Sequence, residues 1–189
     1  VVFMEIQRNE GVQQTAMKNN LEVLMLVGDM LKEKMRVEPH LSHRALIIIN
    51  NVERAKLLVE MYDSLPEDEK PAVRPGVKMV CAAYYGCKDP NEEAEMKGRL
   101  DNFRMKEASS PVHCLVQCLK LGEGYDQANI SVAGICSKIG KVSKFAQFSG
   151  RAVRKQDHNN VEAALVEHIS NKRDNIAHII THSINDQRK

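Results

Sequence analysis

Continuous apolar runs recur along the middle of this chain, separated by amphipathic stretches. One of them, Ala45 to Ile49, is rich in β-branched residues and shows no alternation of apolar and polar positions. Runs of this kind are typical of strands that are buried on both faces of a parallel sheet. We therefore predict strands at residues 44–50, 77–83, 112–119 and 131–136.

The stretches between these strands repeat their apolar residues every three or four positions, as amphipathic helices do. Two helices are predicted, with inward-facing residues Ala55, Leu58, Val59 and Tyr62 in residues 52–65, and Met96, Leu100 and Phe103 in residues 91–104. Strands that alternate with helices indicate an α/β fold with a doubly wound, mostly parallel sheet and right-handed crossovers.

The two ends of the chain are predicted to be helical. Residues 14–35 repeat apolar residues at helical spacing up to Pro39, so an N-terminal helical segment is placed at residues 10–37, and residues 1–7 are either a strand or the end of a linker. A C-terminal helical segment is placed at residues 158–186. Residues 66–76, rich in proline and charge, are predicted to form a loop. We expect a single domain over residues 1–189, with its core at 44–155.

Two short segments carry the candidate chemistry. Gly122-Glu123-Gly124-Tyr125-Asp126 follows the predicted strand at 112–119. Because open α/β sheets bind ligands at the carboxyl ends of their strands, this glycine-rich turn is a candidate ligand loop.

The second segment is basic. If residues 143–155 are helical, Gln147, Arg151 and Arg154 fall on one stripe, and apolar residues fall on the opposite side. Six basic residues and no acidic residue lie within residues 138–155. Phosphate is the expected ligand of such a surface. The alternative is a solvated basic helix.

These segments resemble a known family. Gly124-Tyr125-Asp126 resembles motif V, and Gln147-x-x-Gly150-Arg151-x-x-Arg154 resembles motif VI, of superfamily-two helicases and translocases. The resemblance covers the second, C-terminal RecA-like domain, at about residues 44–155. The strand and helix at 44–65 look like motif IV of the same family.

The resemblance implies an ATP site in a cleft between two RecA-like domains. Arg151 and Arg154 would act as arginine fingers, and Gln147 would contact the phosphate or the attacking water. Gly124, Asp126 and Gly150 would lie at the nucleotide. The resemblance places four residues at the nucleic-acid surface: Asn50, Asn51, Gly86 and Lys138. For Asn50 and Asn51, a role as turn or helix-cap residues is an equal alternative.

The expected cofactors and partners are inferred from two motifs that the sequence lacks. It contains no G-x-x-x-x-G-K-[ST] loop and no acidic pair at the end of a buried strand, which ATP hydrolysis by this class requires. We therefore expect ATP and Mg²⁺ to be shared with a first RecA-like domain of the same full-length protein, and this chain alone to be inactive. Gln147 and Val153 depart from the DEAD-box pattern. Gly150-Arg151-Ala152-x-Arg154 resembles the pattern of excision-repair and restriction-type translocases, which weakly favours DNA over RNA.

Two alternatives remain. One is a degenerate helicase-like domain that binds nucleic acid or acts as a scaffold without hydrolysis. The other is an unrelated doubly wound domain that binds a small phosphorylated ligand at residues 122–126. No G-x-G-x-x-G fingerprint opens a helix here, which counts against the second.

Composition adds little to this picture. A hydrophobic content of 43% is ordinary for a globular domain, and a net charge of +2 indicates no particular partner. No apolar run approaches the ~18 residues of a membrane span, and the N-terminus does not resemble a signal peptide. The five cysteines are expected to be reduced core thiols of an intracellular protein (cytoplasm or nucleus), and no metal site is predicted. The missing initiator Met suggests a piece of a longer protein.

Overall fold

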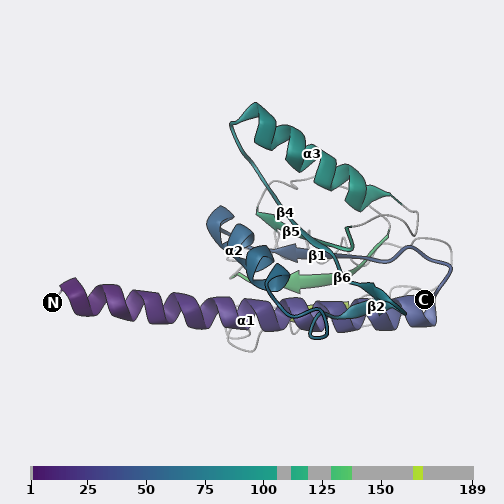
Figure 1. Ribbon diagram of the computed structural model, residues 1–189, viewed down its shortest axis with the longest axis horizontal. Helices are drawn as coiled ribbons and strands as arrows, with labels where there is room; N and C mark the ends of the chain where they lie inside the picture. The colour runs from purple at the N-terminus through teal and green to yellow at the C-terminus, as the bar shows by residue number, and fades with distance from the viewer. Residues whose placement is uncertain (1, 106–111, 119–128, 138–163, 168–189) are drawn as a thin grey trace, which may run out of the picture.

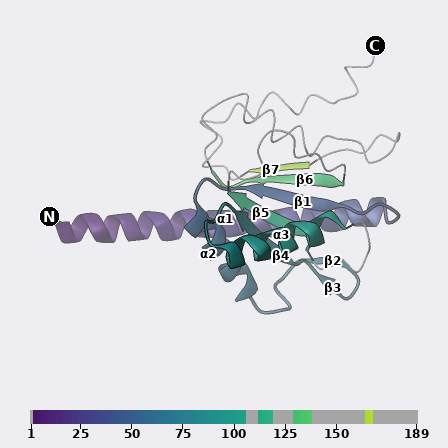
Figure 2. The ribbon, with the colours of Figure 1, turned by 90° about the horizontal axis from the view of Figure 1, so that it is seen from above.

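The computed structural model describes residues 2–105, 112–118, 129–137 and 164–167, with side chains from residue 15 to 137 within these ranges. Its centre is a five-stranded parallel sheet in the order β4-β5-β1-β6-β7, visible in Figure 2. The strands are β1 (Arg44–Ile48), β4 (Cys81–Tyr85), β5 (Cys114–Cys118), β6 (Ile130–Ile135) and β7 (Ala164–Glu167). The predicted α/β fold with a parallel sheet is confirmed.

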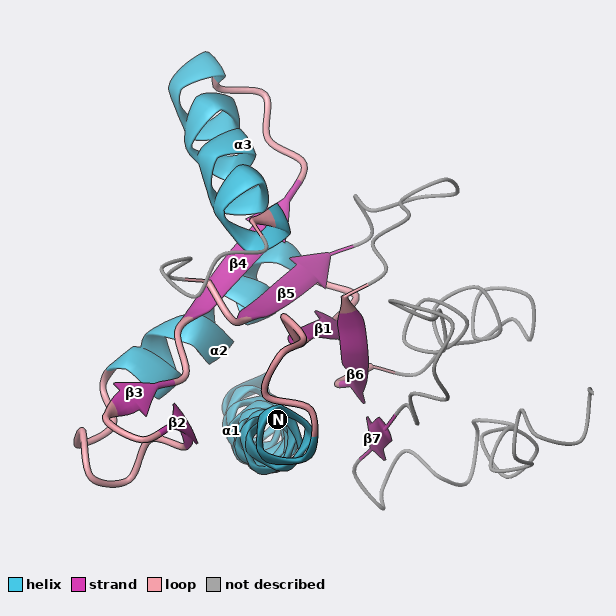
Figure 3. Cartoon of the chain, turned by 90° about the vertical axis from the view of Figure 1, so that its right-hand side faces the viewer, coloured by secondary structure: helices cyan, strands magenta, loops and turns pink. Residues whose placement is uncertain are grey.

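Helices cover both faces of the sheet (Figure 3). On one face, α1 (Val2–Val37) packs on β1, β6 and β7, and α2 (Val52–Asp63) packs on β4 and β5 beside it. On the other face, α3 (Pro90–Arg104) packs on β4 and β5. The sheet is therefore doubly wound, as predicted. The amino-terminal part of α1 extends beyond the sheet in Figure 1.

Four of the five residues of the central strand are buried. Leu46 and Ile47 have no exposed surface, and β1 pairs on one side with β5 and on the other with β6. The register aligns Ala45 with Cys114 and with Val132. Because the side chains on both faces of β1, such as Leu46 and Ile47, are buried, neither face favours polar residues, which explains its unbroken apolar sequence.

Two glycines allow α1 to pack closely. A Cβ at Gly134 in β6 would lie 2.8 Å from Ile47 Cγ1 and 3.0 Å from Val27 Cγ2 of α1. A Cβ at Gly28 in α1 would lie 2.6 Å from both Cβ and Cγ of Pro71. A side chain at Gly134 would crowd Ile47 and Val27, and one at Gly28 would crowd Pro71, just before β2.

The two shorter helices begin at side-chain caps. Asn51 precedes α2, and its Oδ1 accepts a hydrogen bond from Arg54 N at 3.0 Å. Asp89 precedes α3, and its Oδ1 accepts hydrogen bonds from Asn91 N and Glu92 N. Pro90 then occupies the first turn, where its missing N–H costs nothing. Each helix starts a few residues after a strand, at the same edge of the sheet.

The outer edge of β4 is partly closed by α3. Arg99 Nη1 donates a hydrogen bond to Ala83 O at 3.0 Å, and Arg99 Nη2 donates to Glu95 Oε1 at 2.6 Å. An edge strand presents unpaired backbone groups to which other strands can add. The Arg99 guanidinium is bonded to one of these groups, the Ala83 carbonyl, so this part of the edge is less available to another strand.

Four local predictions need correction. Residues 2–7 belong to α1 rather than to a strand or linker, and the predicted loop 66–76 contains β2 (Ala72–Arg74). The strand predicted at 77–83 is divided into β3 (Val77–Lys78), which pairs antiparallel with β2, and β4. Within the C-terminal segment predicted to be helical, residues 164–167 form strand β7. The remainder of that segment lies outside the described residues.

Candidate functional site

The carboxyl edge of the sheet is the candidate site. Because the five strands are parallel, they all end at this edge. The residues that follow β1, β4 and β6 there include Asn50, Gly86 and Ser137, and β5 ends at Cys118. Ligands of open α/β sheets bind at such an edge.

The segments that follow β1 and β6 are bonded to each other. Asn50 N donates a hydrogen bond to Ser137 Oγ at 2.8 Å, and Cys136 N donates to Ile48 O at 3.0 Å. Ser137 is 7% exposed, whereas Asn50 is exposed. These bonds hold the Asn50 backbone in place and leave its side chain at the surface of the edge.

Asn51 is the N-cap residue of α2. Its Oδ1 caps α2, as described above, which satisfies one of the free N–H groups at the helix start. Of the two alternatives for this residue, helix capping is confirmed. Gly86 is exposed, and a Cβ there would meet no atom within 4 Å, so no close packing requires glycine at this position.

A charged cluster at the end of β4 was not predicted. Tyr85 Oη donates a hydrogen bond to Glu92 Oε1 at 2.7 Å, and Lys56 Nζ donates to the same oxygen at 3.1 Å. The Lys56 ammonium also lies 4.7 Å from the centre of the Tyr85 ring. The cluster connects α2, β4 and the first turn of α3. Only the aromatic pair that precedes Gly86 pointed to it in the sequence.

The electrostatics of this cluster favour its ionised form. The hydrogen bonds from Tyr85 and Lys56 lower the pKa of Glu92, and the bond to Glu92 raises the pKa of Lys56. Burial, followed by the bond to Glu92, raises the pKa of the Tyr85 phenol. The carboxylate and the ammonium therefore neutralise each other at neutral pH. The cluster positions the end of β4 rather than presenting a free charge.

The opposite, amino edge contains buried polar residues that hold the fold together. His43 Nδ1 lies 3.0 Å from Ser131 Oγ, and His113 Nδ1 accepts a hydrogen bond from Val80 N at 3.1 Å. Burial lowers the pKa of both imidazoles to about 4, so both are neutral at physiological pH. They directly precede β1 and β5, so they lie at the ends of these strands opposite the candidate edge.

All of the predicted catalytic and nucleotide-binding residues lie outside the described residues. They are Gly124, Asp126, Gln147, Gly150, Arg151 and Arg154, together with Lys138 of the predicted nucleic-acid surface. The described residues stop at Cys118, the end of β5, and at Ser137, shortly after β6. Of the predicted site residues, the structure describes Asn50, Asn51 and Gly86.

Metal ligation and membrane insertion find no support in the described residues. Over the part of the chain that the structure describes, no group of three or more His, Cys, Asp or Glu side chains could hold a metal ion. Within the same ranges, no helix combines the length and the hydropathy that a membrane span requires.

No protein-family model matches this sequence, and no curated protein is significantly similar to it. Among solved structures, the chain is similar to Mss116p DEAD-box helicase domain 2 bound to an RNA duplex, with 12% identity, a TM-score of 0.49, and coverage of 78% of this chain and 51% of that one. It is also similar to the Pyrococcus furiosus Hef helicase domain, with 16% identity, a TM-score of 0.49, and coverage of 82% and 27%.

A third similar structure is the Mycobacterium smegmatis helicase Lhr bound to ssDNA and AMP-PNP, with 14% identity, a TM-score of 0.47, and coverage of 76% of this chain and 17% of that one. The chain thus spans about half of the first of these structures and less of the other two. All three are helicases. Because the identities and TM-scores are low, these similarities assign neither an activity nor a site to this chain.

Proposed function

We propose that this chain is the second RecA-like domain of an ATP-dependent superfamily-two helicase or translocase. The observation that carries the proposal is the position of β5 and β6 on either side of β1, with all three strands ending at one edge. The segments that resemble motifs V and VI follow β5 and β6 in the sequence. The topology supports a common ligand edge for both.

In this proposal the basic stripe acts on the nucleotide. Arg151 and Arg154 stabilise the charge that develops on the γ-phosphate, which is worth ~10³ or more in rate where such fingers have been dissected. Gln147 contacts the phosphate or the attacking water. Gly124 and Gly150 allow the backbone to approach the nucleotide, and Asp126 contacts the ribose or couples the cleft to the nucleic acid.

The remaining half of the site is proposed to lie on a first RecA-like domain of the same full-length protein. The described residues offer no cluster of carboxylates for Mg²⁺, so we assign its ligands, and the phosphate-binding loop, to that domain. ATP and Mg²⁺ would bind between the two domains. We therefore propose that the 189-residue chain alone neither hydrolyses ATP nor unwinds a duplex.

The nucleic-acid surface is proposed to include Asn50, Gly86 and Lys138. Asn50 and Gly86 are both exposed at the carboxyl edge. Asn51 is omitted because its side-chain oxygen caps α2. Of DNA and RNA, we propose DNA as the favoured strand, on the pattern Gly150-Arg151-Ala152-x-Arg154. Equal affinity for matched DNA and RNA strands would remove this preference.

The decisive experiment compares arginine variants of the full-length protein. Arg151→Ala and Arg154→Ala should each abolish nucleic-acid-stimulated ATPase activity while leaving nucleic-acid affinity and the circular dichroism spectrum unchanged. Lys141→Ala is the matched control, because Lys141 is basic, lies in the same segment and falls outside the predicted stripe. Unchanged turnover in both arginine variants would contradict the assignment. A full-length protein that binds nucleic acid without any hydrolysis would support the scaffold alternative.

A further inference from the structure

Two buried thiols lie side by side at the amino ends of neighbouring strands. Cys81 begins β4 and Cys114 begins β5, and their Cα atoms are paired in the parallel register. Paired residues of adjacent parallel strands are separated by about 4.8 Å, the strand spacing, and point to the same face. Both side chains belong to the same buried hydrophobic core. Disulfides form at Cα separations of roughly 4.4–6.8 Å, a range that includes this strand spacing.

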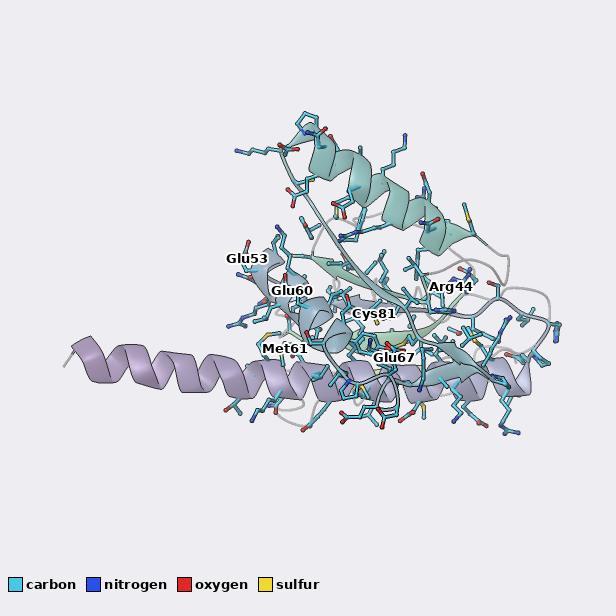
Figure 4. All side chains as sticks on the ribbon, in the orientation of Figure 1. Arg44, Glu53, Glu60, Met61, Glu67 and Cys81 are labelled. Carbon is cyan, nitrogen blue, oxygen red and sulfur yellow. The ribbon has the colours of Figure 1, made fainter. Side chains whose placement is uncertain are left out.

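Both cysteines of this pair are buried in the fold. Both thiols lie near Tyr62 of α2, and Figure 4 shows Cys81 inside the fold. Cys81 is 7% exposed and Cys114 is fully buried. Because β4 is an edge strand, a small oxidant that enters from this side reaches Cys81 before Cys114. The pair begins β4 and β5, at the opposite end from the proposed nucleotide edge.

We propose that Cys81 and Cys114 form a modification site at which a peroxide generates a reversible intramolecular disulfide. In the first step, the Cys81 sulfur attacks hydrogen peroxide, the O–O bond breaks, and a sulfenic acid and water result. In the second, the Cys114 sulfur attacks the sulfenic sulfur, the S–S bond forms, and a second water leaves. Two thiols lose two hydrogens and two electrons, and one peroxide becomes two waters. A dithiol reductant reverses the change.

Oxidation would change the edge of the sheet. The new bond would join β4 covalently to β5 and close a loop over residues 82–113, which contains α3. Such a bond restricts the unfolded chain, so the oxidised protein should be the more stable form. Burial raises the pKa of the Cys81 thiol, which makes the thiolate scarce and the reaction slow. The pair therefore responds to sustained rather than brief oxidation.

A second pair of cysteines provides an internal comparison. Cys118 ends β5 opposite Tyr85, and Cys87 lies two residues beyond Tyr85. Cys87 is only partly buried and is thus the easier thiol to reach. It has no paired position on β5 in the register. If exposure alone decided reactivity, Cys87 would be modified and Cys81 would not.

The test is a disulfide map of the full 189-residue chain after treatment with hydrogen peroxide. In the Cys87→Ala/Cys118→Ala background, the tryptic peptides 79–88 and 107–120 contain one cysteine each, Cys81 and Cys114. We expect these peptides to be joined within one molecule, to separate after dithiothreitol, and to be the main oxidised species. The oxidised chain should also unfold at a higher urea concentration, and adding Cys114→Ala should remove this shift.

The proposal is overturned if the two peptides remain unlinked while Cys81 is oxidised to a sulfinic acid, or if the link forms only between molecules. It is also overturned if both thiols stay reduced during prolonged peroxide treatment that continues well after Cys87 is fully oxidised in the wild-type chain. Should the double background fail to fold, the wild-type chain serves instead. Fragmentation of its linked peptides distinguishes Cys81 from Cys87 and Cys114 from Cys118, so a Cys81–Cys114 link supports the proposal and any other main link overturns it.

Discussion

The Arg44 guanidinium is bonded to the end of α3: its Nη2 donates a hydrogen bond to Met105 O at 2.8 Å. The same guanidinium donates to Phe103 O at 3.3 Å and to His43 O at 3.0 Å. Arg44 is 3% exposed, and burial lowers its pKa to about 10, so it remains charged at neutral pH. Arg44, the first residue of the central strand, thus donates hydrogen bonds to carbonyls at the end of α3, which packs on one face of the sheet.

Removing this guanidinium should destabilise the fold. In Arg44→Met the buried carbonyls lose a charged donor, and we expect the free energy of unfolding to fall by about 2–4 kcal/mol. Arg104→Met is the control, because Arg104 is half exposed and its carboxylate partner Asp101 is 3.8 Å away, so a change below about 1 kcal/mol is expected. Urea denaturation measures both. Equal losses in the two variants would contradict the capping role.

The two asparagines after β1 should separate stability from binding. Asn51→Ala removes the cap of α2 and should lower the free energy of unfolding by about 1 kcal/mol, with nucleic-acid affinity unchanged. Asn50→Ala should leave stability unchanged and weaken nucleic-acid binding by the full-length protein. Denaturation and fluorescence anisotropy measure the two quantities. The reverse pattern would mean that their roles are exchanged.

Alanine should have opposite effects at two glycines. Gly134→Ala places a methyl group 2.8 Å from Ile47 Cγ1 and should destabilise the chain by about 1–3 kcal/mol. Gly98→Ala lies in α3, where a Cβ meets nothing within 4 Å, and should stabilise it by up to about 1 kcal/mol. Thermal unfolding provides the comparison. A neutral Gly134→Ala would show that α1 can move away from β6 at little cost.

Stability should fall in mild acid. The pKa of His43 and that of His113 are lowered from the ordinary 6.5 to about 4 by burial, so the folded chain binds fewer protons than the unfolded chain between these values. Their contribution is therefore fully present above pH 6.5 and is lost as the pH falls toward 4. Each imidazole can account for roughly 3 kcal/mol at most.

The measurement is the free energy of unfolding in urea from pH 7 down to about 4, where the fold loses this contribution. His113→Asn keeps an acceptor for Val80 N and should reduce the proton uptake on unfolding by about one. A His113→Asn variant with the wild-type pH dependence would assign the effect elsewhere.

Much of the fold could be predicted because its cause is local. The β-branched run of β1 is apolar on both faces wherever it lies, and the inward residues of α3, Met96, Leu100 and Phe103, are all buried as their spacing indicates. The division between β3 and β4 could not be predicted. Met79 N bonds to Pro71 O, at the start of the β2–β3 hairpin, and the Val80 backbone bonds to His113, which is distant in sequence.

The sequence alone predicted β1, β5, β6, α2 and α3, since periodicity and turn chemistry act over a few neighbouring residues. The two motifs remain predictions from the sequence. Only the tertiary structure decided the strand order β4-β5-β1-β6-β7, the strand at residues 164–167, and the pairing of Cys81 with Cys114. It also brought Lys56, Tyr85 and Glu92 together from two helices and a strand. These relationships depend on which segments pack together, and residues far apart along the chain carry no local signal of their contact.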